Sequence, residues 1–236
     1  MSYSFGNRKN LFPDDLLPLE PKTHNQELYL EALYSDIPIV VGRGPAGTGK
    51  TAISYRSALQ QVLEPSSPYD KVIITRNIVE SSNSIGFLPG MLADKIDPYL
   101  APYKALSQDF LNFNEPWKLL NDLGNVEFVC SNYIRGITLD RSIIIIDEAQ
   151  TFSYETLKDI ITRAGYYTKI VISGDVAQDD LAKIGQRSGL GKLCDVLKLM
   201  PYGHCFEIEF TLEDIVRSGI VRDFLIADNS YTKIVD

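Results

Sequence analysis

A glycine-rich segment in the first quarter of the chain carries residue types that bind phosphate groups. Residues 44–51 read GPAGTGKT and match the pattern GxxxxGK(S/T) in full. Glycines let the backbone wrap tightly, so that its N–H groups point inward at phosphate oxygens. The lysine of this pattern reaches the β- and γ-phosphates of a nucleotide, and the hydroxyl after it coordinates Mg²⁺. The residues expected to bind nucleotide are Gly44, Pro45, Ala46, Gly47, Thr48, Gly49, Lys50 and Thr51.

Two acidic residues follow a run of isoleucines in the middle of the chain. Residues 142–146 read SIIII, and Asp147-Glu148-Ala149-Gln150 comes next. Open α/β sheets bind ligands at the carboxyl ends of their strands. There Asp147 would hold Mg²⁺, and Glu148 would orient and deprotonate a water for attack on the γ-phosphate. Solvated acids are common at strand ends, but the isoleucine run directly before these two favours the catalytic interpretation.

A third segment, Ser173-Gly174-Asp175-Val176-Ala177-Gln178, also ends a predicted strand. Gln178 is expected to contact the γ-phosphate or the attacking water. Alone, the pattern GDxxQ is also typical of a simple turn, and its place on the strand after the acidic pair is what favours a role. The three segments together predict hydrolysis of ATP with Mg²⁺. A small-molecule kinase is disfavoured because Glu148 is placed to activate water, and a GTPase because the chain has no NKxD segment.

The elements that must position these residues alternate along the chain. Short apolar strands are predicted at 38–41, 71–75, 126–130, 142–146 and 169–173. One helix is predicted to begin near Thr23, and others to span 51–63 and 153–163. Two or more further helices are expected between 91 and 122. This alternation predicts an α/β sandwich with a parallel sheet covered on both faces. The tail predicts a strand from Phe206 and then a helix capped near Thr211. Residues 1–22, with three prolines, are expected to be an extended lead-in, and 23–236 to be a single domain.

Composition excludes several classes of protein. Of the 236 residues, 44% are hydrophobic and 23% are charged, which is typical of a globular chain and not of a disordered or fibrous one. The longest aliphatic run is far shorter than the roughly 20 residues that span a bilayer, and the first residues lack the apolar stretch of a secretion signal. Three cysteines, an odd number, favour reduced thiols. We therefore expect a cytoplasmic protein without membrane contact. A net charge of −8 argues against a dedicated binder of duplex DNA.

The three segments, in this order, resemble motifs I, II and III of superfamily-one helicase ATPases. A closer resemblance is to the PhoH family of phosphate-starvation-associated ATPases, and it extends from about residue 21 to residue 221. The further segments that carry it are 74–76 (ITR), 86–90 (GFLPG), 97–100 (DPYL), 135–136 (RG), 138–139 (TL) and 214–218 (DIVRS). The resemblance implies a single RecA-like P-loop domain that binds and hydrolyses ATP, with a role on RNA. It also makes the helices between 91 and 122 an insert between motifs I and II.

The resemblance assigns a role to one further residue ahead of the phosphate loop. Thr23, Gln26 and Tyr29 form a TxxQxxY segment that is similar to an adenine-reading motif. A glutamine amide donates and accepts at once, which matches adenine N6 and N7. The alternative is an ordinary glutamine on a helix surface.

Some relatives in this family carry a nuclease domain or a KH domain. This chain has no room for either, so we do not expect nuclease activity from it.

A partner is expected because the chain is short for a motor. A superfamily-one helicase uses two RecA-like domains, and only 58 residues follow Gln178. We expect a homo-oligomeric ring, a hexamer being one form, in which a neighbour supplies an arginine in trans; such an arginine is worth about 10³–10⁵ in rate. Arg217 is the first candidate because it lies in the DIVRS segment, and a structural salt bridge is the alternative. The other candidates are Arg163, Arg187 and Arg222.

Single-stranded nucleic acid, RNA before DNA, is the expected macromolecular substrate. Arginines and tyrosines can follow a single strand by charge and stacking, although tyrosine packing within the fold is the plainer interpretation. The candidates are Arg76, Tyr99, Tyr133 and Arg135. The competing function is an assembly or regulatory ATPase, in which the nucleotide controls association and no strand is separated.

Overall fold

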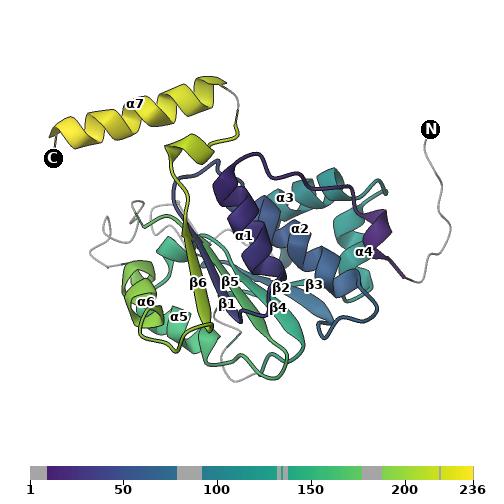
Figure 1. Cartoon of the computed structure of the whole chain (residues 1–236). Coiled ribbons are helices and arrows are strands. Elements are labelled where there is room, and N and C mark those ends of the chain that lie inside the picture. Colours follow the sequence, from purple (N-terminus) through teal and green to yellow (C-terminus); the bar gives the residue numbers. More distant parts are fainter. Residues whose placement is uncertain are drawn as a thin grey trace.

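The structure, a computed structural model, describes residues 10–78, 92–131, 134, 138–176, 188–217 and 219–235. Its strands form one six-stranded sheet in the order β3-β2-β4-β5-β1-β6, in which every neighbouring pair is parallel (Figure 1). The strands are β1 (Ile39–Arg43), β2 (Lys71–Thr75), β3 (Val126–Phe128), β4 (Ser142–Ile146), β5 (Lys169–Gly174) and β6 (Cys205–Glu209). The predicted parallel α/β fold is confirmed.

Both faces of the sheet are apolar. Successive side chains of a strand point to opposite sides, so a strand that is apolar throughout places apolar side chains on both faces. On β4, Ile143 and Ile145 pack into one hydrophobic core, whereas Ile144 and Ile146 pack into the other. All four are fully or almost fully buried. Near-continuous apolar strands are what a sheet covered by helices on both faces requires.

Helices cover both faces of the sheet (Figure 1). Side chains of α1 to α4 contribute to the core on one face, and those of α5 and α6 to the core on the other. Figure 1 shows the last helix, α7, extending away from these layers. The helices are α1 (His24–Tyr34), α2 (Lys50–Leu63), α3 (Leu92–Phe110), α4 (Pro116–Asp122), α5 (Tyr154–Ile161), α6 (Gly189–Leu197) and α7 (Gly219–Val235), with 3₁₀ turns η1 (Pro13–Asp15), η3 (Ala149–Thr151) and η5 (Leu212–Asp214).

The C-terminal segment differs from the sequence prediction. The sequence predicted a helix capped near Thr211. Instead, the three-residue turn η5 follows Thr211, and the long helix α7 begins at Gly219. The cap itself forms, because the Thr211 hydroxyl accepts from the Glu213 N–H and the Asp214 carboxylate accepts from the Thr211 N–H. The turn ends because Val216 donates its N–H to the Gly47 carbonyl, which is outside any helix. Helix α6 was not predicted from the sequence.

The lead-in before α1 packs along α2. Leu11 and Leu16 are buried in the core shared with α1 and α2, and Arg56 of α2 donates to the Leu17 carbonyl at 2.8 Å. The described part of the lead-in includes η1, a single turn. These contacts make residues 11–17 part of the folded unit.

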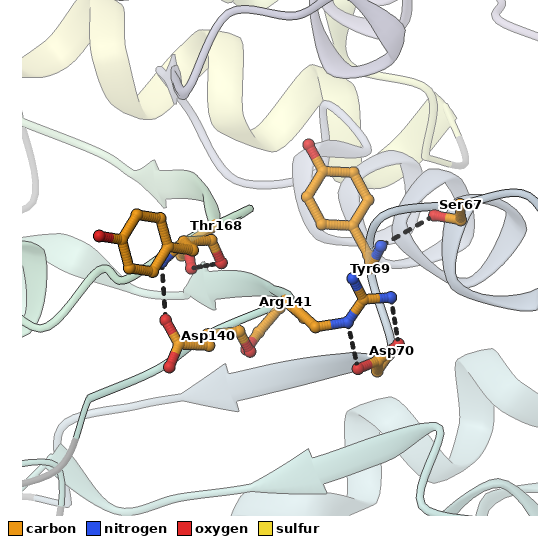
Figure 2. Close-up of polar contacts among 8 residues, drawn as sticks. Ser67, Tyr69, Asp70, Asp140, Arg141 and Thr168 are labelled. Carbon is orange, nitrogen blue, oxygen red and sulfur yellow. Dashed lines mark hydrogen bonds and ion pairs between the residues drawn. The ribbon is translucent and has the colours of Figure 1, made fainter.

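The edge at which the strands begin is tied by polar contacts that Figure 2 shows. Arg141, just before β4, forms a bidentate ion pair with Asp70, just before β2, at 2.7 and 2.9 Å. This pair holds the pKa of the Asp70 carboxyl below its usual range. A cavity of about 380 Å³ lies at this edge. Among the described residues that line this cavity, Arg141 is the cation. Its guanidinium is already paired with Asp70.

Two further expectations concern cysteines and membranes. Cys130, Cys194 and Cys205 form no disulfide, and burial raises the pKa of Cys194 and Cys205 to about 11. These two thiols are therefore protonated at neutral pH.

No helix in the described part of the chain has both the length and the apolar character needed to cross a membrane.

Candidate functional site

The glycine-rich loop lies between β1 and α2, as the sequence predicts. Three of its glycines have positive φ: Gly44 at 135°, Gly47 at 85° and Gly49 at 83°. A Cβ at Gly44 would also stand 2.2 Å from the carbonyl oxygen of Phe210. Both the backbone conformation and the close approach of β6's end therefore require glycine here. The first turn of α2 starts directly at Lys50, so its free N–H groups face into the loop.

The ammonium of Lys50 lies inside the loop. It donates to the carbonyls of Gly44 and Pro45, both at 2.7 Å, and to the Thr48 hydroxyl at 3.1 Å. Burial lowers the pKa of Lys50, and the nearby negative charges, Asp175 first, oppose that shift. Phosphate oxygens arriving in the loop would replace these carbonyls as hydrogen-bond acceptors and restore a close negative charge.

Thr51 and Asp147 meet across the site although 96 residues separate them. The Thr51 hydroxyl donates to Asp147 Oδ1 at 2.9 Å. Among the described residues, no cluster of three or more histidine, cysteine or acidic side chains could hold a metal ion by itself. Two protein oxygens fit Mg²⁺, which is typically bound by one or two side chains together with phosphate oxygens and water. These two residues could hold Mg²⁺ that arrives with a nucleotide.

Glu148 is held by two neighbours and stays accessible. Its backbone is left-handed, with φ of 52°, and its side chain is 44% exposed. Oε2 accepts from the Gln150 amide at 2.7 Å, and Oε1 lies 3.6 Å from the Arg76 guanidinium. The other end of the Gln150 amide accepts from the N–H of Asp175 at 3.0 Å. Gln150 therefore links the acidic pair to the third motif.

One cavity of about 500 Å³ brings these groups together. It opens at the edge where the strands end, and β5 lies between β1 and β4 in the sheet. The loop after β1 and the acids after β4 therefore face each other across the end of β5. Pro102, Ala105 and Leu106 of α3 form an apolar wall of the cavity. The other lining residues include Gly44, Gly47, Gly49, Lys50, Thr51, Arg76, Asp147, Glu148, Gln150, Gly174, Asp175 and Arg217.

Gln26 lies beneath the phosphate loop and is only 3% exposed. Its amide donates to the Thr48 carbonyl at 3.0 Å and accepts from the Lys22 N–H at 2.7 Å. In the same segment, Thr23 caps α1 and the Tyr29 ring fills the space above Gly42. The segment therefore supports the loop in this structure, and its contact with adenine stays a prediction.

Arg217 lies against the phosphate loop of its own chain. Its Cδ is 3.2 Å from the position that a Cβ at Gly47 would occupy, and it lines the cavity. Arg222 is exposed on α7, and Arg163 lies at the opposite edge, where its carbonyl accepts from the Leu139 N–H. Of the remaining candidates, Tyr99 is in α3 and Arg76 is beside Glu148, whereas Gln178, Arg187, Tyr133 and Arg135 lie outside the described residues.

Sequence reasoning assigned no role to three residues that shape the site. The Tyr103 hydroxyl donates to Asp147 Oδ2 at 2.6 Å. Gln150 bridges two motifs, and its place in the DEAQ segment was a signal that could have been used. Phe210 approaches Gly44 and lies 5.8 Å from the Lys50 ammonium. Tyr103 and Phe210 reach the site from distant parts of the chain, and no local pattern marks them.

A parallel sheet with a phosphate-binding loop after one strand and an Asp-Glu pair after another defines a P-loop NTPase domain with a RecA-like α/β fold. The chain belongs to the PhoH family: the family model described as PhoH-like protein matches residues 18–228. This confirms the resemblance found in the motifs.

Individual relatives agree with this assignment. The chain is 38% identical to a PhoH-like protein of Mycobacterium tuberculosis over 213 residues, covering 90% of this chain and 58% of the relative. It is 37% identical to a PhoH-like protein of Bacillus subtilis, covering 87% and 62%. It thus spans about 60% of these curated relatives. Among solved structures, the large terminase of a thermophilic bacteriophage, determined in complex with ADP, is similar with a TM-score of 0.50 and 13% identity, covering 86% of this chain and 48% of the terminase.

Proposed function

We propose that this chain is a Mg²⁺-dependent ATP hydrolase of the PhoH type whose activity is coupled to single-stranded nucleic acid, RNA before DNA, in a homo-oligomer. The observation that carries the proposal is the shared cavity that Lys50, Thr51, Asp147 and Glu148 line. These four residues supply a cation for phosphates, two oxygens for a metal and a carboxylate for water. The absence of an NKxD segment favours ATP over GTP.

The residues divide the chemistry among them. Lys50 would transfer its hydrogen bonds from the loop carbonyls to the β- and γ-phosphates, and the loop N–H groups would hold the same oxygens. Thr51 and Asp147 would hold Mg²⁺, which when bound neutralises developing charge on the phosphates. Glu148 would accept the proton of the attacking water, because it is accessible and its carboxylate is oriented by Gln150.

Coupling to nucleic acid is supported by the position of Arg76. It lies at the end of β2, lines the cavity and approaches Glu148. A phosphate of a bound strand that attracted Arg76 would change the surroundings of the proposed base. Because the chain carries a net charge of −8, such binding should be salt-sensitive.

An assembly or regulatory ATPase without strand separation is the second candidate. Helix α7 favours it, since Ile220 and Phe224 are 80% and 68% exposed on a helix that extends away from the rest of the fold. Exposed large apolar side chains on such a helix suit contact with another subunit.

Steady-state ATP hydrolysis with Mg²⁺ tests both candidates. Native protein and Glu148→Gln should be compared with and without single-stranded RNA and single-stranded DNA. We expect hydrolysis to fall by at least about 10²-fold in Glu148→Gln, while ATP binding, measured by calorimetry, persists. Stimulation of the native protein by RNA would support coupling to nucleic acid, and indifference to both strands would favour the assembly ATPase. A variant as active as the native protein would rule out Glu148 as the base.

A further inference from the structure

The insert between motifs I and II reaches into the acidic centre of the site through one side chain. Tyr103 of α3 is fully buried, and its hydroxyl donates to Asp147 Oδ2 at 2.6 Å. Asp147 Oδ1 accepts from Thr51 at 2.9 Å. Each carboxylate oxygen thus accepts from one donor among the described residues, and the backbone of Asp147 is fixed by its N–H bond to the Thr75 carbonyl at 3.0 Å.

The Tyr103 ring has little freedom to turn away. It meets Tyr55 edge to face, with centroids 6.1 Å apart, and it packs against Trp117 and Phe128, each at 6.2 Å. These neighbours come from α2, α4 and β3, so the ring is held between two helices and a strand of the sheet. The carbonyl of Tyr103 also accepts from the Ser107 hydroxyl within α3. A carboxylate oxygen can only accept, so the Tyr103 hydroxyl is the donor in its bond to Asp147.

We infer that Tyr103 is a positioning residue that orients the Asp147 carboxylate for Mg²⁺, so that the α3 insert sets the metal affinity of the site. Outer hydrogen bonds to a metal-holding carboxylate fix its orientation, and their loss typically costs about 10- to 100-fold in metal affinity or activity. The same helix contributes Pro102, Ala105 and Leu106 to the cavity wall. Packing of the insert is thereby connected directly to the metal-binding oxygen atoms. The inference rests on the proposed Mg²⁺-dependent binding of ATP.

The matched control is Tyr55, which is equally buried in the same aromatic cluster. Its hydroxyl bonds to Ser107 at 2.8 Å and is not bonded to Asp147. Tyr103→Phe and Tyr55→Phe each remove one buried hydroxyl and retain the ring. General damage to packing would therefore appear in both variants, whereas an effect through Asp147 would appear only in Tyr103→Phe.

The test is Mn²⁺ binding to the full chain in the presence of ADP, followed by the loss of the free-ion signal in electron paramagnetic resonance. We expect Tyr103→Phe to bind Mn²⁺ about 10-fold or more weakly than the native protein, and Tyr55→Phe to bind like it. The Mg²⁺ concentration for half-maximal hydrolysis should rise in parallel, with the rate at saturating Mg²⁺ nearly unchanged. Equal affinity in Tyr103→Phe and native protein, or equal losses in both variants, would overturn the inference alone. A native protein that binds no Mn²⁺ with ADP would overturn the proposed function as well.

Discussion

Gln150 joins two of the segments that line the cavity. It is 2% exposed, its amide nitrogen donates to Glu148, and its amide oxygen accepts from the Asp175 N–H. An amide is the side chain that can satisfy a carboxylate on one side and a backbone N–H on the other. The orientation of Glu148, the proposed base, therefore depends on a hydrogen bond from this neighbouring amide.

At the residue scale, Gln150→Glu should separate binding from hydrolysis. The new carboxylate can still accept from Asp175, but it faces the carboxylate of Glu148 and repels it. We expect the hydrolysis rate to fall about 10- to 100-fold, no more than the lower end of the roughly 10²- to 10⁴-fold contribution of a positioned general base, with ATP affinity nearly unchanged. Steady-state kinetics with calorimetric binding would measure this. The control is Gln61→Glu on α2, where the native amide donates to the Leu33 and Ser57 carbonyls away from the cavity. Unchanged hydrolysis in Gln150→Glu would contradict the role.

At the scale of elements, the segment after β6 is anchored to α1. The Asp214 carboxylate accepts from the Thr23 hydroxyl at 2.6 Å and from the Asn25 amide at 2.8 Å, as well as from Thr211. Burial alone would raise the pKa of Asp214, but hydrogen bonds from Thr211, Thr23 and Asn25 outweigh it and lower that pKa. This anchor precedes Arg217 by three residues, and so it holds the arginine over the phosphate loop.

Asp214→Asn should destabilise the fold in a pH-dependent way. Because the carboxyl pKa is lower in the folded chain, its stabilisation is complete above the unfolded pKa of about 3.9 and is lost as the pH falls through the lower, folded value. We expect the free energy of unfolding at pH 7 to drop by about 1–3 kcal/mol, and the difference from the native protein to shrink below about pH 4. Urea unfolding at pH 7 and below about pH 4 measures this difference in the free energy of unfolding. Asp195→Asn, which removes an exposed pair with Lys198, should cost less than about 1 kcal/mol. An equal loss at both pH values would contradict the role of charge.

At the scale of the whole molecule, the order of strands decides which motifs meet. The strand that precedes the phosphate loop and the strand that precedes the acidic pair are separated in the sheet by β5. The Asp175 backbone at the end of β5 therefore lies between them, where Gln150 reaches it. Helix α7 extends away from these layers (Figure 1), and Ile220 and Phe224 on it are exposed.

Mixed oligomers would decide which chain Arg217 serves. Arg217→Ala and Glu148→Gln should each reduce hydrolysis strongly, by about 10³-fold for an arginine that stabilises the transition state. Because Arg217 contacts its own loop, we expect a mixture of the two variants to hydrolyse ATP no faster than their average. Recovery of activity on mixing would instead show that one subunit supplies the arginine to a neighbour's site. Size-exclusion chromatography with ATP and Mg²⁺ must first show that mixed oligomers form, and mixtures of each variant with native protein provide the reference.

The sequence alone determined the parts of this protein whose causes are local. The phosphate loop is eight consecutive residues whose glycines and lysine act on one ligand, and β2 and β4 have the predicted bounds because apolar runs specify buried strands. The parallel fold followed from the alternation of such runs with helices.

Only the tertiary structure decided which residues support that site. Tyr103 meets Asp147 across 44 residues of sequence, and Gln26 meets Thr48 across 22. The helix expected after Thr211 gave way to a single turn because Asp214 and Val216 bond to α1 and to the phosphate loop. Contacts of this kind depend on how the elements pack, and no periodic pattern in the sequence records them, because their free energy comes from partners that are far apart along the chain.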